Sequence, residues 1–507
     1  MRRMAGAPDG GEAVLLGVDL GSTAAKVVAA TRGARVRARA ERGYALRADR
    51  ADEVVHDPEQ VLVAGLGALR DCVRLCAEAR HPVVGLALTG SLHSVIALDD
   101  ALQPLTPSLS WADNRALEQA ERLRGQPRGR TLHRETGTPA HPMAPRSKLA
   151  WFAEREPDLA ARVRCWCGIK DLAAYRLTGR MVTDHSSASA TGLLDLRGLA
   201  WHPDALDVAR VRADQLPELV APTAALPLSA PAGRAAGLPP GLPVVVGGGN
   251  GPMASVGVGA ATPGTGALSL GMGGAFRVVR DTPEVGERCE LFCHSVVDGL
   301  WAVGGAISNG GVVGEWAADA FGAEEPEDLL DEAALVPGGA RGLVVLPYLL
   351  GERAPWWDPL PRCAVLGLRR EHGRAELTRA LVEGVGQQLA LVRDAVLATG
   401  APVRTVRASG ESFRAALWRD VVSAALDTPL ELCGERDPAA LGTALVGWRA
   451  LGEIPSLAAV GDQLRPDHVV EPDPALARRL GSARPLVRRA HEALQGLSVD
   501  LARLSEE

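Results

Sequence analysis

Apolar and polar positions divide the N-terminal part of the chain into short buried strands. Residues 13–19 (AVLLGVD) are almost wholly apolar, and after the bend LGST, residues 24–30 (AAKVVAA) are apolar again. Two apolar runs around a glycine-bearing bend predict a buried β-hairpin. Residues 82–89 (PVVGLALT) predict a further buried strand, and a short strand at 95–98 follows a polar interruption.

Helical spacing of apolar residues alternates with these strands. The predicted helices cover residues 58–79, 114–124, 147–154, 169–177, 376–396 and 414–425, with a short strand at 404–408. From residue 474 onward Leu, Ala and Arg recur at helical spacing, and we expect this tail to pack on the outside. Strands that alternate with helices are typical of α/β proteins, so we predict the α/β fold class.

An uncharged tract marks the middle of the chain. Residues 235–276 contain no Asp, Glu, Lys or Arg, and they include PVVVGGGNG and GALSLGMGGAF. We expect interior strands joined by glycine loops here, and the start of a second domain. The order strand, glycine bend, strand at 267–279 repeats that of the N-terminal hairpin, which indicates a duplicated core with both hairpins facing one cleft.

Length and charge exclude several classes of protein. The chain has 507 residues, too many for one compact core. The chain has 55 Lys and Arg against 61 Asp and Glu, a net charge of −6. It therefore lacks the excess of basic residues that is typical of nucleic-acid-binding proteins. No run of about 18 apolar residues is free of Gly and Pro, and the N-terminus has no apolar signal core. We therefore predict a multidomain protein with no nucleic-acid partner and no membrane span.

The eight cysteines are sparse for a chain of this length. None of them falls into the doubled C-x2-C spacing that is typical of a zinc site. We therefore expect buried free thiols and a cytoplasmic location, where the thiols stay reduced. A metal site near Cys289, Cys293 and His294 is the alternative.

The bend after the first predicted strand carries groups that suit a phosphate. Gly21 lets backbone N–H groups approach an anion, and Ser22 and Thr23 add hydroxyl donors. Asp19 could hold Mg²⁺ or its water shell, and Lys26 follows in the second strand. Asp and Gly also form ordinary tight turns, so the motif alone leaves both interpretations open.

A series of longer motifs carries a specific resemblance. In chain order they are GVDLGSTAAKVV, SLHSVIALD, WADNRA, TGTPAHPMAPRSKLAW, SSASATGLLDL, GGAISNGGVVGEW, LPYLLGERAPWWDP and LGLRREHGRAELTRALVEG. Together they resemble the FGGY family of carbohydrate kinases, and above all its gluconokinase branch. The resemblance runs over residues 14–448, and MAPRSKLAWFAE and GERAPWWDP are its most specific pieces.

The resemblance implies a two-domain fold of the actin, sugar-kinase and Hsp70 type, which is ribonuclease H-like, with a central cleft. An N-terminal sugar-binding domain would cover residues 1–245, a C-terminal nucleotide-binding domain residues 246–480, and a helical tail residues 481–507. ATP and Mg²⁺ would be the cofactors and a small sugar, sugar acid or polyol the substrate. A homodimer is a further expectation.

Motif matching with this family assigns candidate site residues. The first phosphate loop would comprise Asp19, Gly21, Ser22, Thr23 and Lys26, with Asp19 at the Mg²⁺ ion. Sugar contacts would come from His93, Trp111, Asp113, Arg115 and Asn309, and nucleotide contacts from Gly271, Gly273, Gly410, Glu411 and Asp437. Without the resemblance, Asp113 and Arg115 are also explained as the start of a capped helix, and His93 as a core histidine.

Three departures from the family pattern concern catalysis and the nucleotide. Asn250 stands where the family has the Asp that accepts the proton of the attacking hydroxyl, and loss of such a base typically costs ~10²- to 10⁴-fold in rate. Met272 and Gly273 replace two hydroxyl residues of the second phosphate hairpin, and Glu411 replaces a glycine of the adenosine loop. The hypotheses are therefore an FGGY-type kinase with impaired transfer, a kinase-like protein (a pseudokinase) that binds a polyhydroxylated ligand or a partner without catalysis, and a different reaction in the same pocket.

Overall fold

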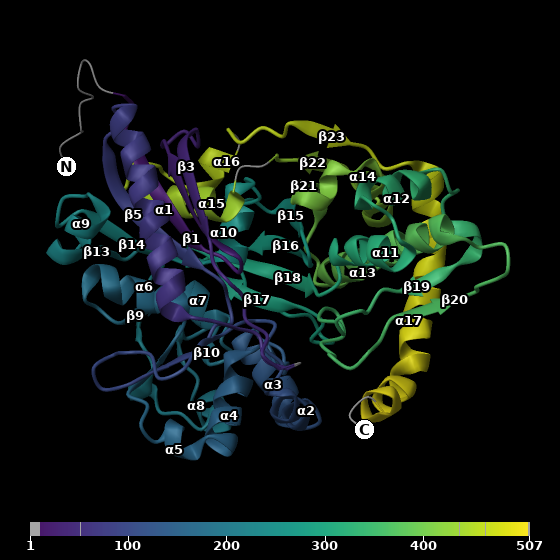
Figure 1. The fold of residues 1–507 in the computed structure, drawn as a ribbon, viewed down its shortest axis with the longest axis horizontal. Helices are drawn as coiled ribbons and strands as arrows, with labels where there is room; N and C mark the ends of the chain where they lie inside the picture. The colour runs from purple at the N-terminus through teal and green to yellow at the C-terminus, as the bar shows by residue number, and fades with distance from the viewer. Residues whose placement is uncertain (1–10, 51, 435–436, 462, 505–507) are drawn as a thin grey trace.

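The computed structural model describes residues 11–504 except 51, 435, 436 and 462, and it has two lobes, each built around one β-sheet. The N-terminal lobe carries a six-stranded sheet and the C-terminal lobe a seven-stranded sheet, with helices on their faces (Figure 1). The predicted α/β class is confirmed.

The first sheet has the strand order β13-β14-β5-β1-β2-β3. Its strands are β13 (Ala225–Pro227), β14 (Pro243–Gly249), β5 (Val83–Gly90), β1 (Val14–Leu20), β2 (Ala24–Ala30) and β3 (Val36–Gly43). β1 pairs antiparallel with β2, as the apolar pattern predicts, and parallel with β5 on its other side. The predicted division between residues 245 and 246 cuts through β14, which pairs parallel with β5 as part of the first sheet.

Alternate residues of β1 face two different helical layers. Val14, Leu16 and Val18 pack in a core with α1 (Pro58–Glu78) and α6 (Ile169–Thr178). Leu15 faces the opposite way, into a core with α15 (Pro438–Ala450), although α15 lies more than 400 residues later in the chain. The period of two along a strand thus fixes which helices cover which face.

Helix α10 (Asn250–Gly257) packs closely on α15 between the two sheets, and glycines make that approach feasible. A Cβ on Gly257 would lie 1.8 Å from the carbonyl oxygen of Pro438, and one on Gly442 would lie 1.9 Å from that of Met253. A Cβ on Gly17 of β1 would likewise meet the carbonyl oxygen of Ala440 at 1.9 Å. Asn250 therefore begins a helix whose position is fixed by backbone contact.

The second sheet repeats the arrangement of the first. Its order is β17-β18-β16-β15-β21-β22-β23, with β17 (Phe292–Ser295), β18 (Trp301–Ile307), β16 (Gly274–Arg280), β15 (Gly264–Leu270), β21 (Val403–Ser409), β22 (Leu430–Leu432) and β23 (His468–Val470). β15 pairs antiparallel with β16 and parallel with β21, as β1 does with β2 and β5. The predicted second hairpin is confirmed, and the repeated pairing agrees with a duplicated core.

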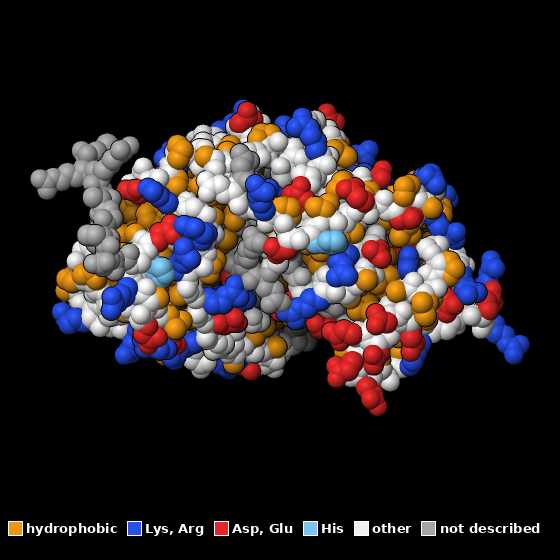
Figure 2. Space-filling model, turned by 90° about the horizontal axis from the view of Figure 1, so that it is seen from above, with side chains coloured by type: hydrophobic (Ala, Val, Ile, Leu, Met, Phe, Trp, Pro, Cys, Tyr) orange, Lys and Arg blue, Asp and Glu red, His pale blue; other side chains and the backbone are white. Residues whose placement is uncertain are grey.

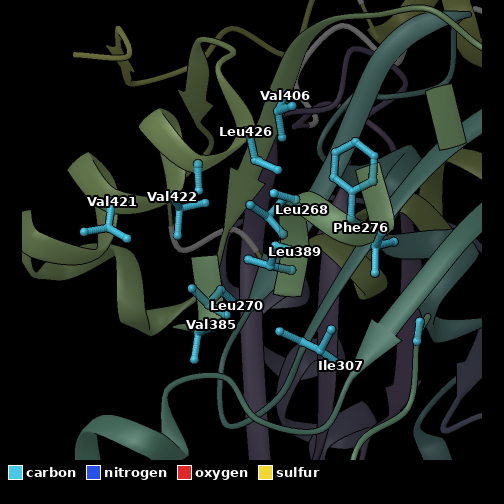
Figure 3. Packing of buried hydrophobic residues seen from close by; sticks show 14 of the residues in the cluster. Leu268, Leu270, Phe276, Ile307, Val385, Leu389, Val406, Val421, Val422 and Leu426 are labelled. Carbon is cyan, nitrogen blue, oxygen red and sulfur yellow. The ribbon is translucent and has the colours of Figure 1, made fainter. Parts of the chain in front are cut away.

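One face of the second sheet is covered by α13 (Arg374–Ala398) and α14 (Ala416–Leu426). Figure 3 shows Leu268 and Leu270 of β15 beside Val385 and Leu389 of α13, with the side chains of α14 close by. The predicted helices at 376–396 and 414–425 correspond to α13 and α14, although residues 411–414 form a separate 3₁₀ turn before α14.

The remaining elements surround these two sheets. Between β5 and β13 lie β6 (Ile96–Leu98), α2 (Leu117–Arg124), α3 (Pro127–Thr136), α4 (Pro145–Arg155), α5 (Pro157–Ala160), β8 (Cys165–Cys167), α7 (His185–Ser189) and α8 (Pro203–Ala209); the C-terminal lobe adds α11 (Val312–Phe321), α12 (Pro326–Ala334), β19 (Val344–Leu346) and β20 (Ala364–Leu366). The tail is one helix, α17 (Pro474–Leu504), which packs on α13, α14 and β19 at the edge of the lobe (Figure 1).

The surface is that of a mixed-charge protein. Acidic and basic side chains are interspersed over the face in Figure 2, with a group of acidic side chains at the lower edge of this view. Within the described residues, no helix is both long enough and apolar enough to cross a bilayer.

Candidate functional site

A cavity of about 140 Å³ lies between the two lobes. Its wall comprises Ser22, Ser91, Leu92, His93, Trp111, Met143, Asn250, Gly251, Arg277, Phe292, His294, Ala306 and Arg353. Four residues singled out from the sequence, Ser22, His93, Trp111 and Asn250, therefore meet at one place. Ser22, His93 and Asn250 come shortly after β1, β5 and β14, and the carboxyl ends of these parallel strands lie at the same edge of the sheet. Trp111 comes from the segment after the short strand Ser108–Leu109, outside this sheet.

Asp113 and Arg115 do not line this cavity. The Asp113 carboxylate is fully buried, accepts from the backbone N–H of Val54 at 3.0 Å, and pairs with the Arg115 guanidinium at 3.0 Å. Arg115 also donates to Glu53 at 3.3 Å and lies over the ring of Trp151. Both side chains have their hydrogen-bond partners within the protein, and they fix the turn before α2. This agrees with the other explanation given for them from the sequence, the start of a helix.

Asn309 is likewise occupied by protein groups and lies outside the cavity wall. Its side-chain amide donates to the carbonyl oxygen of Gly351 at 2.7 Å and to Glu352 Oε2 at 3.1 Å, and its Oδ1 accepts from Leu350 N at 3.1 Å. The buried Glu352 carboxylate also accepts from the backbone N–H of Ser308 at 2.6 Å. In this structure Asn309 ties the loop at 350–353 to the end of β18.

The His93 ring is held in one orientation. Its backbone has a φ of 67°, a left-handed conformation that is uncommon for residues other than glycine. Nδ1 lies 2.8 Å from the carbonyl oxygen of Ala190, and the Lys148 ammonium donates to the backbone carbonyls of His93 and Ser110. Burial lowers the pKa of His93 to about 3, and the nearby cations of Lys148 and Arg353 add to the effect. The imidazole is therefore neutral at physiological pH.

Two guanidinium groups face the cavity from the C-terminal lobe, and the sequence reasoning missed both. Arg353 lies over the ring of Trp111 at 4.5 Å and donates to the carbonyl oxygen of Ile307 at 2.6 Å. Arg277 lies over Phe292, and its solvent-inaccessible Nε has no hydrogen-bond partner. Burial lowers the pKa of each to about 10, so both stay charged at neutral pH. A usable signal was that Arg277 is the first charged residue after the long uncharged tract.

His294 was considered from the sequence only as a metal ligand. Its ring stacks on Phe292 with centroids 4.3 Å apart, and neither of its buried nitrogens has a hydrogen-bond partner. In the described part of the chain, no group of three or more His, Cys, Asp or Glu side chains is arranged to hold a metal ion. His294 is therefore a wall residue of the cavity with unused hydrogen-bonding capacity.

Asp19 lies at the end of β1, beside the bend with Ser22 and Thr23. Burial raises the pKa of Asp19 to about 7, against the opposing effect of Lys26, and its buried Oδ1 has no hydrogen-bond partner. Lys26 in turn pairs with Asp437 at 3.3 Å. An unpartnered carboxylate oxygen suits Mg²⁺, which is commonly held by one or two carboxylates together with substrate phosphates and water.

The second predicted phosphate hairpin lies at the bend between β15 and β16. Gly271 donates to the carbonyl oxygen of Gly273 at 2.9 Å and accepts from the N–H of Gly311 at 2.7 Å. Gly410 has a φ of 124°, and a Cβ there would lie 2.1 Å from the carbonyl oxygen of Leu270, so only glycine fits. Met272 is 61% exposed at the tip. The fold thus supplies a tight backbone cradle but no hydroxyl at its tip.

Glu411 follows this cradle at the start of the 3₁₀ turn and is exposed. Its carboxylate adds a negative charge at the place where the family resemblance expects a nucleotide. Asp437, the other predicted nucleotide contact, precedes α15 with a left-handed φ of 46°. Both residues lie outside the cavity wall that holds His93 and Asn250.

Comparison with known families covers most of the chain. The sequence model described as the FGGY family of carbohydrate kinases, N-terminal domain, matches residues 14–257, and the model of the C-terminal domain matches residues 264–451. A gluconokinase of Bacillus subtilis (strain 168) is 33% identical over 463 residues, which are 89% of this chain and 90% of the relative. A xylulose kinase of Escherichia coli (strain K12) is 30% identical over 423 residues, 80% of this chain and 84% of the relative.

Solved structures agree with these matches. The crystal structure of gluconate kinase from Lactobacillus acidophilus superimposes with a TM-score of 0.90 at 29% identity, covering 96% of this chain and 98% of that one. The predicted two-domain sugar-kinase fold is thereby confirmed.

Proposed function

Because this chain belongs to the FGGY family of carbohydrate kinases, we propose that it transfers the γ-phosphoryl group of MgATP to a hydroxyl of a sugar acid of the gluconate class. The observation that carries the choice of a sugar acid is the Arg277 guanidinium, whose buried Nε has no partner at the cavity wall. The similarity to gluconokinases of Bacillus subtilis and Bacillus licheniformis supports this choice.

The charge of the cavity argues for an anionic substrate. Its wall contains Arg277 and Arg353 but no Asp or Glu side chain. A buried cation without a counter-ion is costly, and a planar carboxylate can accept two parallel hydrogen bonds from a guanidinium. A neutral ketose or polyol would leave that charge uncompensated. Trp111 and the two imidazoles would contact the C–H faces and the hydroxyls of the same ligand.

The phosphate side supports transfer from a nucleotide. Asp19 offers its free carboxylate oxygen to Mg²⁺, which when bound neutralises charge on the phosphates, and Ser22 and the glycine bends offer donors. Asn250, Met272 and Glu411 favour a second candidate, a ligand-binding protein without catalysis. Phosphoryl transfer depends mainly on alignment and charge, so these changes are compatible with turnover. The cytoplasmic location and the homodimer remain predictions.

Calorimetry with a matched pair of variants tests the substrate class. We expect gluconate to bind at least 10-fold more tightly than xylulose, and Arg277→Gln to remove that preference, since a charge-assisted pair contributes roughly 1.5–3 kcal/mol. Arg280→Gln is the control, because Arg280 lies on the same strand but pairs with Glu284 and Thr399 outside the cavity. Equal affinity of the wild type for neutral and acidic sugars would refute the sugar-acid assignment. Turnover is then measured by ADP release with gluconate and MgATP, and its absence at saturating concentrations would favour the binding protein.

A further inference from the structure

A kinase with this cavity needs a group that takes the proton of the attacking hydroxyl. The residue at the start of α10 is Asn250, whose amide has no useful basicity, and no residue of the cavity wall is Asp or Glu. The titratable groups on the wall are two guanidiniums, which stay protonated, and the imidazoles of His93 and His294. The acceptor therefore has to be sought among the two histidines.

His93 has the geometry of a proton acceptor. Nδ1 carries the ring hydrogen, because its neighbour at 2.8 Å is the Ala190 carbonyl oxygen, which can only accept. The neutral ring then has its lone pair on Nε2, and among the described residues the hydrogen bond of the ring is the one made by Nδ1. The left-handed backbone at His93 and the Lys148 ammonium on its carbonyl oxygen hold the ring in this orientation. Such local strain is often found where a side chain must be aimed.

We infer that His93 Nε2 accepts the proton of the attacking sugar hydroxyl, in place of the carboxylate that is absent at position 250. This inference rests on the proposed kinase function. The hydroxyl oxygen forms a bond to the γ-phosphorus, the bond from that phosphorus to the bridging oxygen breaks, and its electron pair leaves with ADP. The hydroxyl proton moves to Nε2, and the imidazolium releases it to water after the products leave.

The proposed role requires bound ligands to raise the pKa of His93 above its low value of about 3 in the empty cavity. The charged groups that face the ring are Lys148 of α4 and Arg353, and burial is the largest cause of the lowered pKa. The sugar carboxylate and the γ-phosphoryl group bring negative charge to these cations. His294 of β17 has its ring centroid 6.1 Å from that of His93, and its free nitrogens can hold a hydroxyl of the same ligand.

A double-mutant cycle tests the assignment. In His93→Asn the amide nitrogen keeps a donor for Ala190, the left-handed backbone suits Asn, and the Nε2 acceptor is lost. We expect kcat with gluconate to fall by about 10²-fold while the gluconate Kd, measured by calorimetry, changes less than about fivefold. In an Asn250→Asp background, the carboxylate takes the proton, so His93→Asn should cost less than about fivefold.

Each other outcome overturns a stated part of the inference. Unchanged kcat in His93→Asn, or the same loss in both backgrounds, would show that His93 is not the acceptor. A wild type that turns over no sugar acid would overturn the proposed function, and the inference with it. His93→Gln replaces His93→Asn if the latter fails to fold. His133→Gln is the control for a buried histidine, because His133 is buried and bonded to a carbonyl oxygen, that of Leu291, but lies outside the cavity.

Discussion

At the scale of single residues, the Asp19 carboxylate has a protonation state that changes near neutral pH. Its pKa is raised from an ordinary value near 3.8 to about 7 because the group is buried. Below pH 7 the empty protein therefore holds Asp19 mainly as the neutral acid, and above pH 7 as the carboxylate. Only the carboxylate is a good ligand for Mg²⁺.

We accordingly predict that MgADP binds about fivefold more tightly at pH 7 than at pH 6 and about 10-fold more tightly at pH 8 than at pH 6. With a pKa of about 7, the ionised fraction of Asp19 rises from about a tenth to about a half and then to about nine-tenths over this range. Calorimetry at pH 6, 7 and 8 measures the affinity. Asp19→Asn should bind weakly with little dependence on pH. An affinity that is constant over this range in the wild type would show that Asp19 does not contribute to metal binding.

At the scale of elements, the contact between α10 and α15 sets the position of residue 250. The two helices touch through Gly257 and Gly442, where a side chain would overlap backbone atoms. Backbone atoms cannot move aside as a flexible side chain can. The steric cost therefore exceeds the gain in helix propensity that alanine normally gives.

Gly442→Ala is predicted to lower the free energy of unfolding by about 1–3 kcal/mol, as overpacking does. Denaturant unfolding followed by circular dichroism measures the change. Gly481→Ala in α17 is the matched control, because a Cβ there has no neighbour within 4 Å. That variant should gain up to about 1 kcal/mol. A stabilising effect of Gly442→Ala would mean that the two helices are less closely packed than described.

The helices and strands also show how much of the structure can be predicted from the sequence. The apolar runs predict both hairpins and most helices to within a few residues, because each pattern is local. The helix expected from residue 114 begins at Leu117, since the Asp113–Arg115 pair forms a turn first. The motifs led to His93, Trp111 and Asn250. They did not lead to Arg277, which the sequence marks only as the first charged residue after the uncharged tract, and the sequence considered His294 only as a metal ligand. That a buried polar atom lacks a partner is a property of the folded surroundings and cannot be read from the chain.

At the scale of the whole molecule, residues of the first sheet share one hydrophobic core with a helix from the C-terminal half of the chain. One face of the first sheet is covered by α15, and the core there joins Leu15 and Val28 to Ala440 and Leu445. Nothing in the local pattern of α15 predicts this return, because its apolar residues would suit either lobe. The boundary between the two family models, at 257–264, therefore separates sequences whose side chains share one core.

We predict that a fragment of residues 1–260 does not fold cooperatively, since it exposes the apolar face that α15 covers. Size-exclusion chromatography, binding of a hydrophobic dye and denaturant unfolding test this, with the full chain as the reference. Strong dye binding and a broad transition are expected. A sharp transition with the fragment monomeric would contradict it.

Arg353 contacts both halves of the proposed site. Its guanidinium donates to the carbonyl oxygen of Ile307, lies close to the second phosphate hairpin at Gly273, and covers the ring of Trp111 at the sugar cavity. A ligand in the sugar cavity that attracts the Arg353 guanidinium changes the electrostatic potential at the second phosphate hairpin, and the reverse also holds. The binding free energies of the two ligands are therefore coupled, and thermodynamic linkage makes this coupling equal in both directions. Water in the cavity carries no negative charge that could pair with Arg277 or Arg353, whereas a sugar acid does. Under the proposed function, in which Arg277 holds the sugar carboxylate, Arg353 would thus give the protein a way to leave the nucleotide unhydrolysed until the acceptor has arrived.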